Sequence, residues 1–166
     1  EDHQTRFYAC FAIAIAAVMA IAYAENLFTL FIFYEVLSLC TYPLVTHAGT
    51  EKAKKGGRVY LGILMGTSIA FFLPAIIITW LVAGTLDFQQ GGIFPEQTPI
   101  ALLSLLLVLF VFGVAKAAVM PFHRWLPAAM VAPTPVSALL HAVAVVKAGV
   151  FSLIKILVFI FGLDTL

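Results

Sequence analysis

Long apolar runs recur along the whole chain, and they constrain its fold more than any other feature. A helix needs about 20 predominantly apolar residues to cross the hydrocarbon core of a bilayer, and runs close to this length follow one another here. Of the 166 residues, 63% are hydrophobic and 10% are charged, whereas soluble domains carry roughly 25% charged residues. A secretory signal has an apolar core of only about 7–15 residues and occurs once. The sequence therefore predicts an all-α membrane protein with several transmembrane helices.

Polar segments divide the chain into five predicted spans. The segment HAGTEKAKKGG covers residues 47–57, and the segment GTLDFQQGGIFPEQTP covers residues 84–99. Pro135 begins the last span, because proline fits the first turn of a helix. Since Glu1 is not a methionine, we expect the chain to be part of a longer protein. The predicted spans are 7–24, 27–46, 58–83, 100–130, which is broken near 116–121, and 135–162.

The basic residues predict an orientation. Lysine and arginine favour the cytoplasmic side of a membrane protein, and the segment 47–58 carries four of them against one glutamate. We therefore expect the 47–58 loop in the cytoplasm. If the spans alternate, Arg6 and Arg124 fall on the same side. The acidic residues of the opposite side are Glu25, Asp87, Glu96 and Asp164. A net charge of +1 argues against nucleic acid as a partner.

The segment KAAVMPFHRWLP predicts a helix broken at membrane depth. It follows an uncharged apolar run and places Lys116 near the middle of a span that reaches Met130. Pro121 lacks a backbone donor and clashes with the preceding turn. A break inside the bilayer persists only where protein or water covers the freed backbone groups, and transporters bind ions at such breaks. A lysine near the end of an ordinary span is the alternative.

Two further ionisable residues lie near the centres of spans. Glu35 lies midway along the second span, and Lys147 lies midway along the fifth. A charge at the bilayer centre costs about 2.5–3.5 kcal/mol on insertion scales. Burial and a nearby carboxylate shift a lysine pKa in opposite directions, so such a lysine can exchange a proton when its partner moves. We therefore predict a proton relay through Glu35, Lys116 and Lys147. A structural ion pair that joins helices is the alternative.

Further polar residues are candidates for additional relay steps or for anchoring the chain at the membrane interface. His141 is a candidate relay, because the pKa of histidine near 6.5 suits proton transfer; a histidine hydrogen-bonded to a neighbouring helix is the alternative. Lys155 is a candidate exit relay, with snorkelling to the membrane surface as the alternative. Three residues after the break are predicted interface anchors: His123, Arg124 and Trp125.

No cofactor or metal is predicted. Cys10 and Cys40 are 30 residues apart, without a second ligand at metal-binding spacing, so we expect them to be packing residues. Only one histidine, His141, lies clearly inside a span, which argues against a haem held by two histidines.

The segment AKAAVMPFHRWLPAAMVAPTPVSALLHAVAVVKAGVF strongly resembles the core of the antiporter-like subunits of respiratory complex I. The same family includes Mrp-type sodium/proton antiporters and membrane-bound hydrogenases. The segment FYEVLSLCTYPLVTH is similar to the glutamate-bearing helix of that family. The similarity covers nearly the whole chain.

The resemblance implies a fold, a site and partners. It implies the first of two inverted five-helix units in a subunit of about fourteen helices. It assigns the ion-pair glutamate to Glu35, the lysine of the broken helix to Lys116 and the next relay to Lys147 and His141. The partners implied are the lipid bilayer, other membrane subunits and the remainder of a longer chain, in a bacterial or archaeal plasma membrane. Where the family usually has aspartate, in LPDAM, this chain has Ala128, so no role is carried over to that position.

The sequence therefore predicts translocation of protons, with sodium as the other candidate ion. The chain is not expected to be catalytic alone; it would serve a complex I-like oxidoreductase or a cation/proton antiporter. The alternatives are a structural membrane subunit with helix-joining ion pairs, and a quinone- or haem-binding redox subunit.

Overall fold

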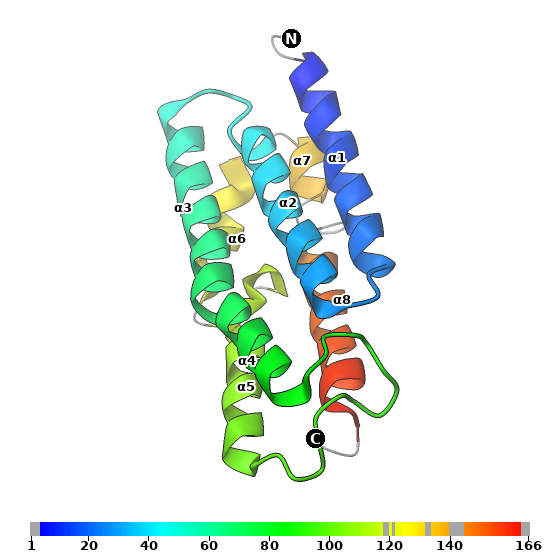
Figure 1. Cartoon of the computed structure of the whole chain (residues 1–166). Helices are drawn as coiled ribbons and strands as arrows, with labels where there is room; N and C mark the ends of the chain where they lie inside the picture. Colours follow the sequence, from blue (N-terminus) through cyan, green and yellow to red (C-terminus); the bar gives the residue numbers. More distant parts are fainter. Residues whose placement is uncertain (1–3, 118–119, 121, 132–133, 140–144, 164–166) are drawn as a thin grey trace.

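The computed structural model describes residues 4–117, 120, 122–131, 134–139 and 145–163, and over these residues the chain is built from helices (Figure 1). The longer helices are α1 (Gln4–Ala22), α2 (Leu27–Val45), α3 (Glu51–Thr67), α4 (Leu73–Ala83), α5 (Ile100–Gly113) and α8 (Val145–Ile156). Short helices are α6 (Trp125–Ala128) and α7 (Thr134–Ala138). Within the described residues, π-helical turns cover Ser68–Phe72 and Leu157–Phe161, and 3₁₀ turns cover Ala115–Ala117, Phe122–Arg124 and Ala129–Val131.

Three continuous helices in the described residues are long and apolar enough to cross a membrane. They are Gln4–Ala22, Leu27–Val45 and the 33-residue run Glu51–Ala83, and Ile100–Gly113 is a shorter apolar helix. In Figure 1, α1, α2 and the α3–α4 run lie roughly alongside one another, and the chain reverses direction between them. The all-α, membrane-type fold predicted from the apolar runs is therefore observed.

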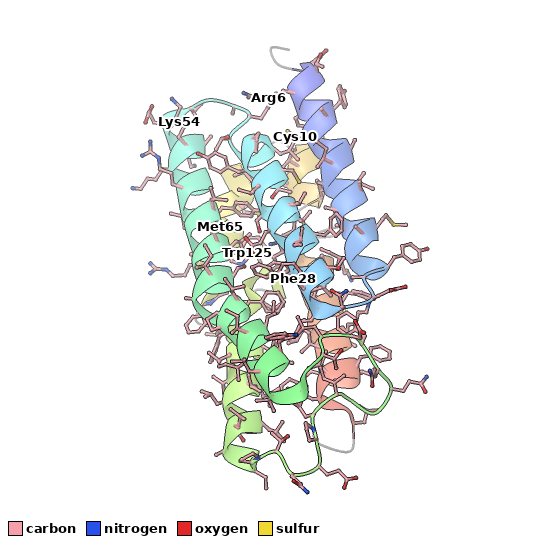
Figure 2. All side chains as sticks on the ribbon, viewed as in Figure 1. Arg6, Cys10, Phe28, Lys54, Met65 and Trp125 are labelled. Atoms are coloured by element: carbon pink, nitrogen blue, oxygen red, sulfur yellow. The ribbon has the colours of Figure 1, made fainter. Side chains whose placement is uncertain are left out.

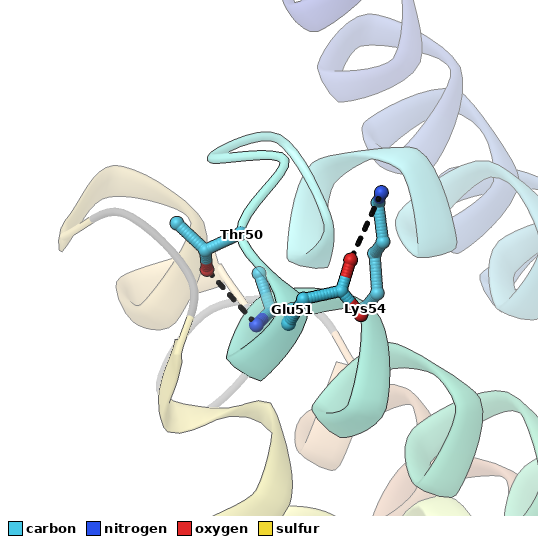
Figure 3. Close-up of polar contacts among 4 residues, drawn as sticks. Thr50, Glu51 and Lys54 are labelled. Atoms are coloured by element: carbon cyan, nitrogen blue, oxygen red, sulfur yellow. Dashed lines mark hydrogen bonds and ion pairs between the residues drawn. The ribbon is translucent and has the colours of Figure 1, made fainter.

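The third long helix begins at Glu51, seven residues before the predicted start at 58. The Thr50 side chain accepts a hydrogen bond from the backbone N–H of Ala53 at 3.1 Å, which caps the helix. Glu51 lies in the first turn, where its negative charge interacts favourably with the helix dipole. Its Oε1 atom lies 3.5 Å from the Nζ atom of Lys54, in an ion pair (Figure 3). Most of the predicted polar loop is therefore the first turns of α3.

A π-helical turn joins α3 to α4 and forms part of the core. Phe72, at the end of this turn, contacts the rings of Phe31 and Tyr34, each at 5.4 Å between centroids, and the ring of Phe110 at 5.9 Å. Gly113 packs directly on the Phe72 backbone, because a Cβ at Gly113 would lie 2.8 Å from the Phe72 Cα. The absence of a side chain at Gly113 therefore allows α5 to approach the π-helical turn.

The predicted loop 84–99 is held by backbone hydrogen bonds to two distant segments of the chain, the α1–α2 turn and the π-helical turn after α8. Leu27 N–H donates to the carbonyl of Leu86, and Phe88 N–H donates to the carbonyl of Glu25. Further along, Ile93 N–H donates to the carbonyl of Ile160. The loop therefore ties the α1–α2 turn to the π-helical turn Leu157–Phe161 that follows α8.

The apolar helix α5 ends at Gly113, three residues before Lys116. Val114 has φ −89° and ψ 60°, which is not helical, and Lys116 then lies in the 3₁₀ turn Ala115–Ala117. The chain resumes short helical turns at Phe122–Arg124 and in α6. The described part of the predicted fourth span is therefore interrupted, and Pro121 lies outside the described residues.

Lys155 of α8 lies against the end of α1. Its ammonium donates to the carbonyl oxygens of Ala24, at 2.6 Å, and Ala22, at 3.5 Å, and lies 4.6 Å from the ring centroid of Phe88. The last carbonyls of a helix have no partner within that helix, and α1 has no basic residue in its own last turn. Lys155 therefore caps α1 from another helix.

Replacing Gly113 with alanine should destabilise the protein. The added methyl group overlaps the Phe72 backbone, and such overpacking costs about 1–3 kcal/mol. Thermal unfolding in detergent measures the effect. Gly66→Ala is the matched control, because no atom lies within 4 Å of a Cβ at that helical position. Equal melting temperatures for the two variants would contradict this account of the α5 packing.

Replacing Lys155 with methionine should lower the free energy of local opening at the end of α1 by about 1–2 kcal/mol. The reason is that two carbonyl groups lose a hydrogen-bond donor and the negative end of the helix dipole loses a nearby positive charge. Hydrogen exchange at Tyr23 and Ala24 should rise, whereas Lys155→Arg should largely preserve protection. Unchanged exchange in Lys155→Met would rule out the capping role.

Candidate functional site

The candidate site is centred on Lys116, whose side chain is fully buried. Its ammonium donates a hydrogen bond to the Ser38 hydroxyl. The same nitrogen lies 3.5 Å from the ring centroid of Tyr34, in a cation–π arrangement. The backbone N–H of Lys116 donates to the Tyr34 hydroxyl at 3.2 Å. A lysine is therefore held inside the protein by neutral groups.

Two helices position these groups. Tyr34 and Ser38 are four residues apart on α2, so their side chains lie on one face of that helix. From α8, Gly149 packs on the turn that carries Lys116, because a Cβ at Gly149 would lie 2.8 Å from the Lys116 Cβ. The lysine turn is thus enclosed between α2 and α8.

Glu35 lies next to Tyr34 in the sequence and near Lys116 in space. Both of its carboxylate oxygens are shielded from solvent, and neither accepts a well-aligned hydrogen bond from a described residue. The Ser68 hydroxyl lies beside it and donates to the Leu64 carbonyl at 2.8 Å. The charges of Glu35 and Lys116 are close enough to interact. They form no direct ion pair, since the described residues contain only the Lys54–Glu51 pair.

A second group of hydroxyls lies one helical turn further along α2. The Thr41 hydroxyl shares a buried hydrogen bond with the Tyr60 hydroxyl of α3 and also donates to the Leu37 carbonyl at 2.7 Å. The Tyr60 ring contacts the ring of Trp125 at 5.6 Å between centroids. Trp125 is fully buried and lies between the long helices in Figure 2; its predicted role as an interface anchor stays a prediction. The contact between Trp125 and Tyr60 contributes to this burial, and sequence spacing does not reveal it.

Lys147 lies away from this buried group. Its side chain is exposed, in an apolar groove between α1 and α8, and it forms no hydrogen bond or ion pair with a described residue. The groove has a volume of about 210 Å³. Its other lining residues are Val18, Ile21, Ala22, Ala148 and Phe151.

The residues of the predicted relay differ in their surroundings. Glu35 and Lys116 interact electrostatically in the buried region, whereas Lys147 is exposed and His141 lies outside the described residues. The Lys155 ammonium is engaged with carbonyl groups. His123 is half-buried and Arg124 is exposed.

Sequence reasoning missed Tyr34 and Ser38. The signal was the segment YEVLS, in which a tyrosine precedes Glu35 and a serine follows it by three residues. Residues three or four apart share a helix face, so Ser38 could have been placed beside Glu35, and Tyr34 on the same face as Ser38. Their contact with Lys116, about 80 residues further along, required the tertiary structure.

Residues 24–165 match the family described as NADH:quinone oxidoreductase/Mrp antiporter, TM. The chain is 35% identical over 160 residues to a probable K⁺/H⁺ antiporter subunit of Rhizobium meliloti, covering 93% of this chain and 16% of that protein. It is 31% identical over 168 residues to the chloroplastic NAD(P)H-quinone oxidoreductase subunit 5 of Chlorokybus atmophyticus, covering 91% of this chain and 25% of that protein.

Solved structures show the same fold. The Mrp complex from Dietzia sp. DQ12-45-1b contains a chain with a TM-score of 0.81 and 30% identity, covering 89% of this chain and 16% of that one. An archaeal membrane-bound sulfane sulfur reductase gives a TM-score of 0.78 at 24% identity, covering 94% of this chain and 32% of that one. This chain thus spans from about a sixth to a third of the proteins it resembles. Because the family match extends over most of its residues, the chain belongs to the NADH:quinone oxidoreductase/Mrp antiporter transmembrane family.

Proposed function

We propose that this chain forms an ion-translocating part of a complex I-like or Mrp-type membrane complex. Protons are the proposed ion, with sodium as the other candidate cation. The observation that carries the proposal is the fully buried amine of Lys116, held by neutral groups beside Glu35. Ionisable groups inside membrane proteins are costly and mark ion pathways. Two relatives, a probable antiporter subunit and a quinone oxidoreductase subunit, support the same class of function.

The proposed mechanism uses the distance between Glu35 and Lys116. When the carboxylate approaches, it stabilises the ammonium, and Lys116 holds a proton. When the two separate, the buried amine loses that stabilisation and releases the proton. A lysine can perform this exchange, whereas an arginine stays charged in proteins.

Lys147 and His141 are the proposed next steps. Lys147 borders the groove between α1 and α8, so a proton that reaches it leaves the buried group for the outer face of this helical unit. Residues of a longer chain or a neighbouring subunit would continue the path from there. Moving one charge against 100 mV costs about 2.3 kcal/mol, so the complete complex must supply the driving force.

Replacing Lys116 with methionine in the complete complex should abolish ion translocation. We expect a loss of at least about 100-fold, a typical minimum for removing a proton-transferring group, because methionine binds no proton. Lys116→Arg should also fail, since it retains the charge without exchanging it. The measurement is the response of a pH-sensitive dye in membrane vesicles, with assembly checked by native gel electrophoresis.

Lys52→Met is the control, because Lys52 is exposed on α3. If Lys116→Met assembles and translocates normally, the proposed function is wrong. If it prevents assembly while Lys116→Arg assembles and translocates, Lys116 only joins helices through its charge.

The start of α3 is proposed to face the cytoplasm. Arg6 and Lys54 lie at the same end of the protein in Figure 2, and basic residues favour the cytoplasmic side. After replacement of Cys10 and Cys40, a single cysteine at Lys52 should resist a membrane-impermeant maleimide in intact cells. A single cysteine at Gln97, exposed in the 84–99 loop, should react. The reverse labelling pattern would invert the orientation.

A further inference from the structure

We propose that Tyr34 and Ser38 form a neutral docking site that competes with Glu35 for the Lys116 amine. In this proposal, Gly149 sets how closely the lysine turn approaches α8. The inference rests on the proposed function and names positioning residues for it. It concerns where the amine resides when it is not paired with the carboxylate.

The Ser38 hydroxyl is oriented to accept from the amine. It donates its own proton to the Tyr34 carbonyl at 3.3 Å, within α2. Its lone pairs are therefore available, and the Lys116 ammonium donates to them. Ser38, Tyr34 and Lys116 are all fully buried, so water does not compete for this contact from the protein surface.

Tyr34 holds Lys116 at two points. Because α5 ends at Gly113, the N–H of Lys116 has no helical partner, and the Tyr34 hydroxyl accepts it at 3.2 Å. The face of the same ring lies under the ammonium at 3.5 Å. The Phe72 ring contacts the Tyr34 ring at 5.4 Å between centroids, which fixes the tyrosine from the side of the π-helical turn.

Gly149 closes the site from α8. A methyl group there would overlap the Lys116 backbone and Cβ, so any larger residue must push the lysine turn away from α8. The glycine is two residues from Lys147. The depth of Lys116 and the position of the proposed next relay are thus set by one helix.

The docking site has a consequence for proton exchange. A hydroxyl and an aromatic face stabilise an ammonium less than a carboxylate does. An amine docked on Ser38 and Tyr34 therefore releases a proton more readily than an amine paired with Glu35. The ionisable groups that surround Lys116 are Tyr34, Glu35 and Cys40 of α2. Of the other packed helices, α3 contributes Tyr60 to the same buried region, and Lys147 of α8 is exposed in its groove.

Without the docking site, Glu35 should be the main partner of the Lys116 amine. In Ser38→Ala, we expect slower translocation and an alkaline limb of the pH–rate profile that moves upward by at least about 0.5 pH unit, because the ammonium is then held by a carboxylate. Ser38→Thr keeps the hydroxyl and should restore the profile. The measurement is the initial rate of dye-detected ion uptake in vesicles that contain the complete complex, between acidic and alkaline pH.

Thr79→Val is the matched control. The buried Thr79 hydroxyl bonds only to the Ala75 carbonyl of its own helix among the described residues, so its loss should leave the profile in place. If Ser38→Ala does not assemble, Tyr34→Leu tests the same shift. For the glycine, Gly149→Ala should lower the rate, whereas Gly62→Ala, which meets no atom within 4 Å, should not.

The outcomes separate the two proposals. If Lys116→Met is inactive but Ser38→Ala and Tyr34→Leu keep the profile of the unmodified complex, the docking site is wrong and the lysine relay stands. A downward shift in Ser38→Ala would also overturn the docking site, because it would mean that the freed amine does not pair with Glu35. If Lys116→Met remains active, the proposed function itself fails.

Discussion

The burial of the Lys116 amine is the constraint on which the rest of the site depends. An unpaired charge inside a protein is costly, and here the ammonium has a hydroxyl and an aromatic face as its immediate partners. Both come from one face of α2, which must therefore lie directly against the turn that carries the lysine. The interruption after Gly113 makes this possible, because a continuous helix would leave no free N–H for the Tyr34 hydroxyl.

Small residues set the distances around this interruption. Gly113 allows α5 to reach the backbone of Phe72, and Gly149 allows α8 to reach the backbone of Lys116. Because helices in lipid gain little from the hydrophobic effect between them, close backbone packing is a main source of their association. Phe72 then links the two contacts, since its ring packs on Tyr34. The packing that joins the helices is thus continuous with the packing that orients the site.

Much of the fold could be predicted from local sequence, and the failures have physical causes. The apolar runs located α1 and α2 within a few residues, because the bilayer demands a fixed length of apolar helix. The start of α3 was misplaced because its basic residues were interpreted as a loop, although Thr50 caps the helix and Glu51 lies in its first turn. The burial of Trp125 against the ring of Tyr60, which is 65 residues away in the sequence, could not be predicted from local sequence.

The sequence by itself determined that the chain is a membrane-type helical protein and that Glu35 and Lys116 lie within apolar segments. These properties follow from hydropathy. Only the tertiary structure decided which groups touch the amine. Tyr34 and Ser38 are about 80 residues from Lys116, and Lys155 caps a helix more than 130 residues away. Such contacts depend on how helices pack, and the strongly apolar surfaces of these helices carry too little amphipathic pattern to specify that packing in advance.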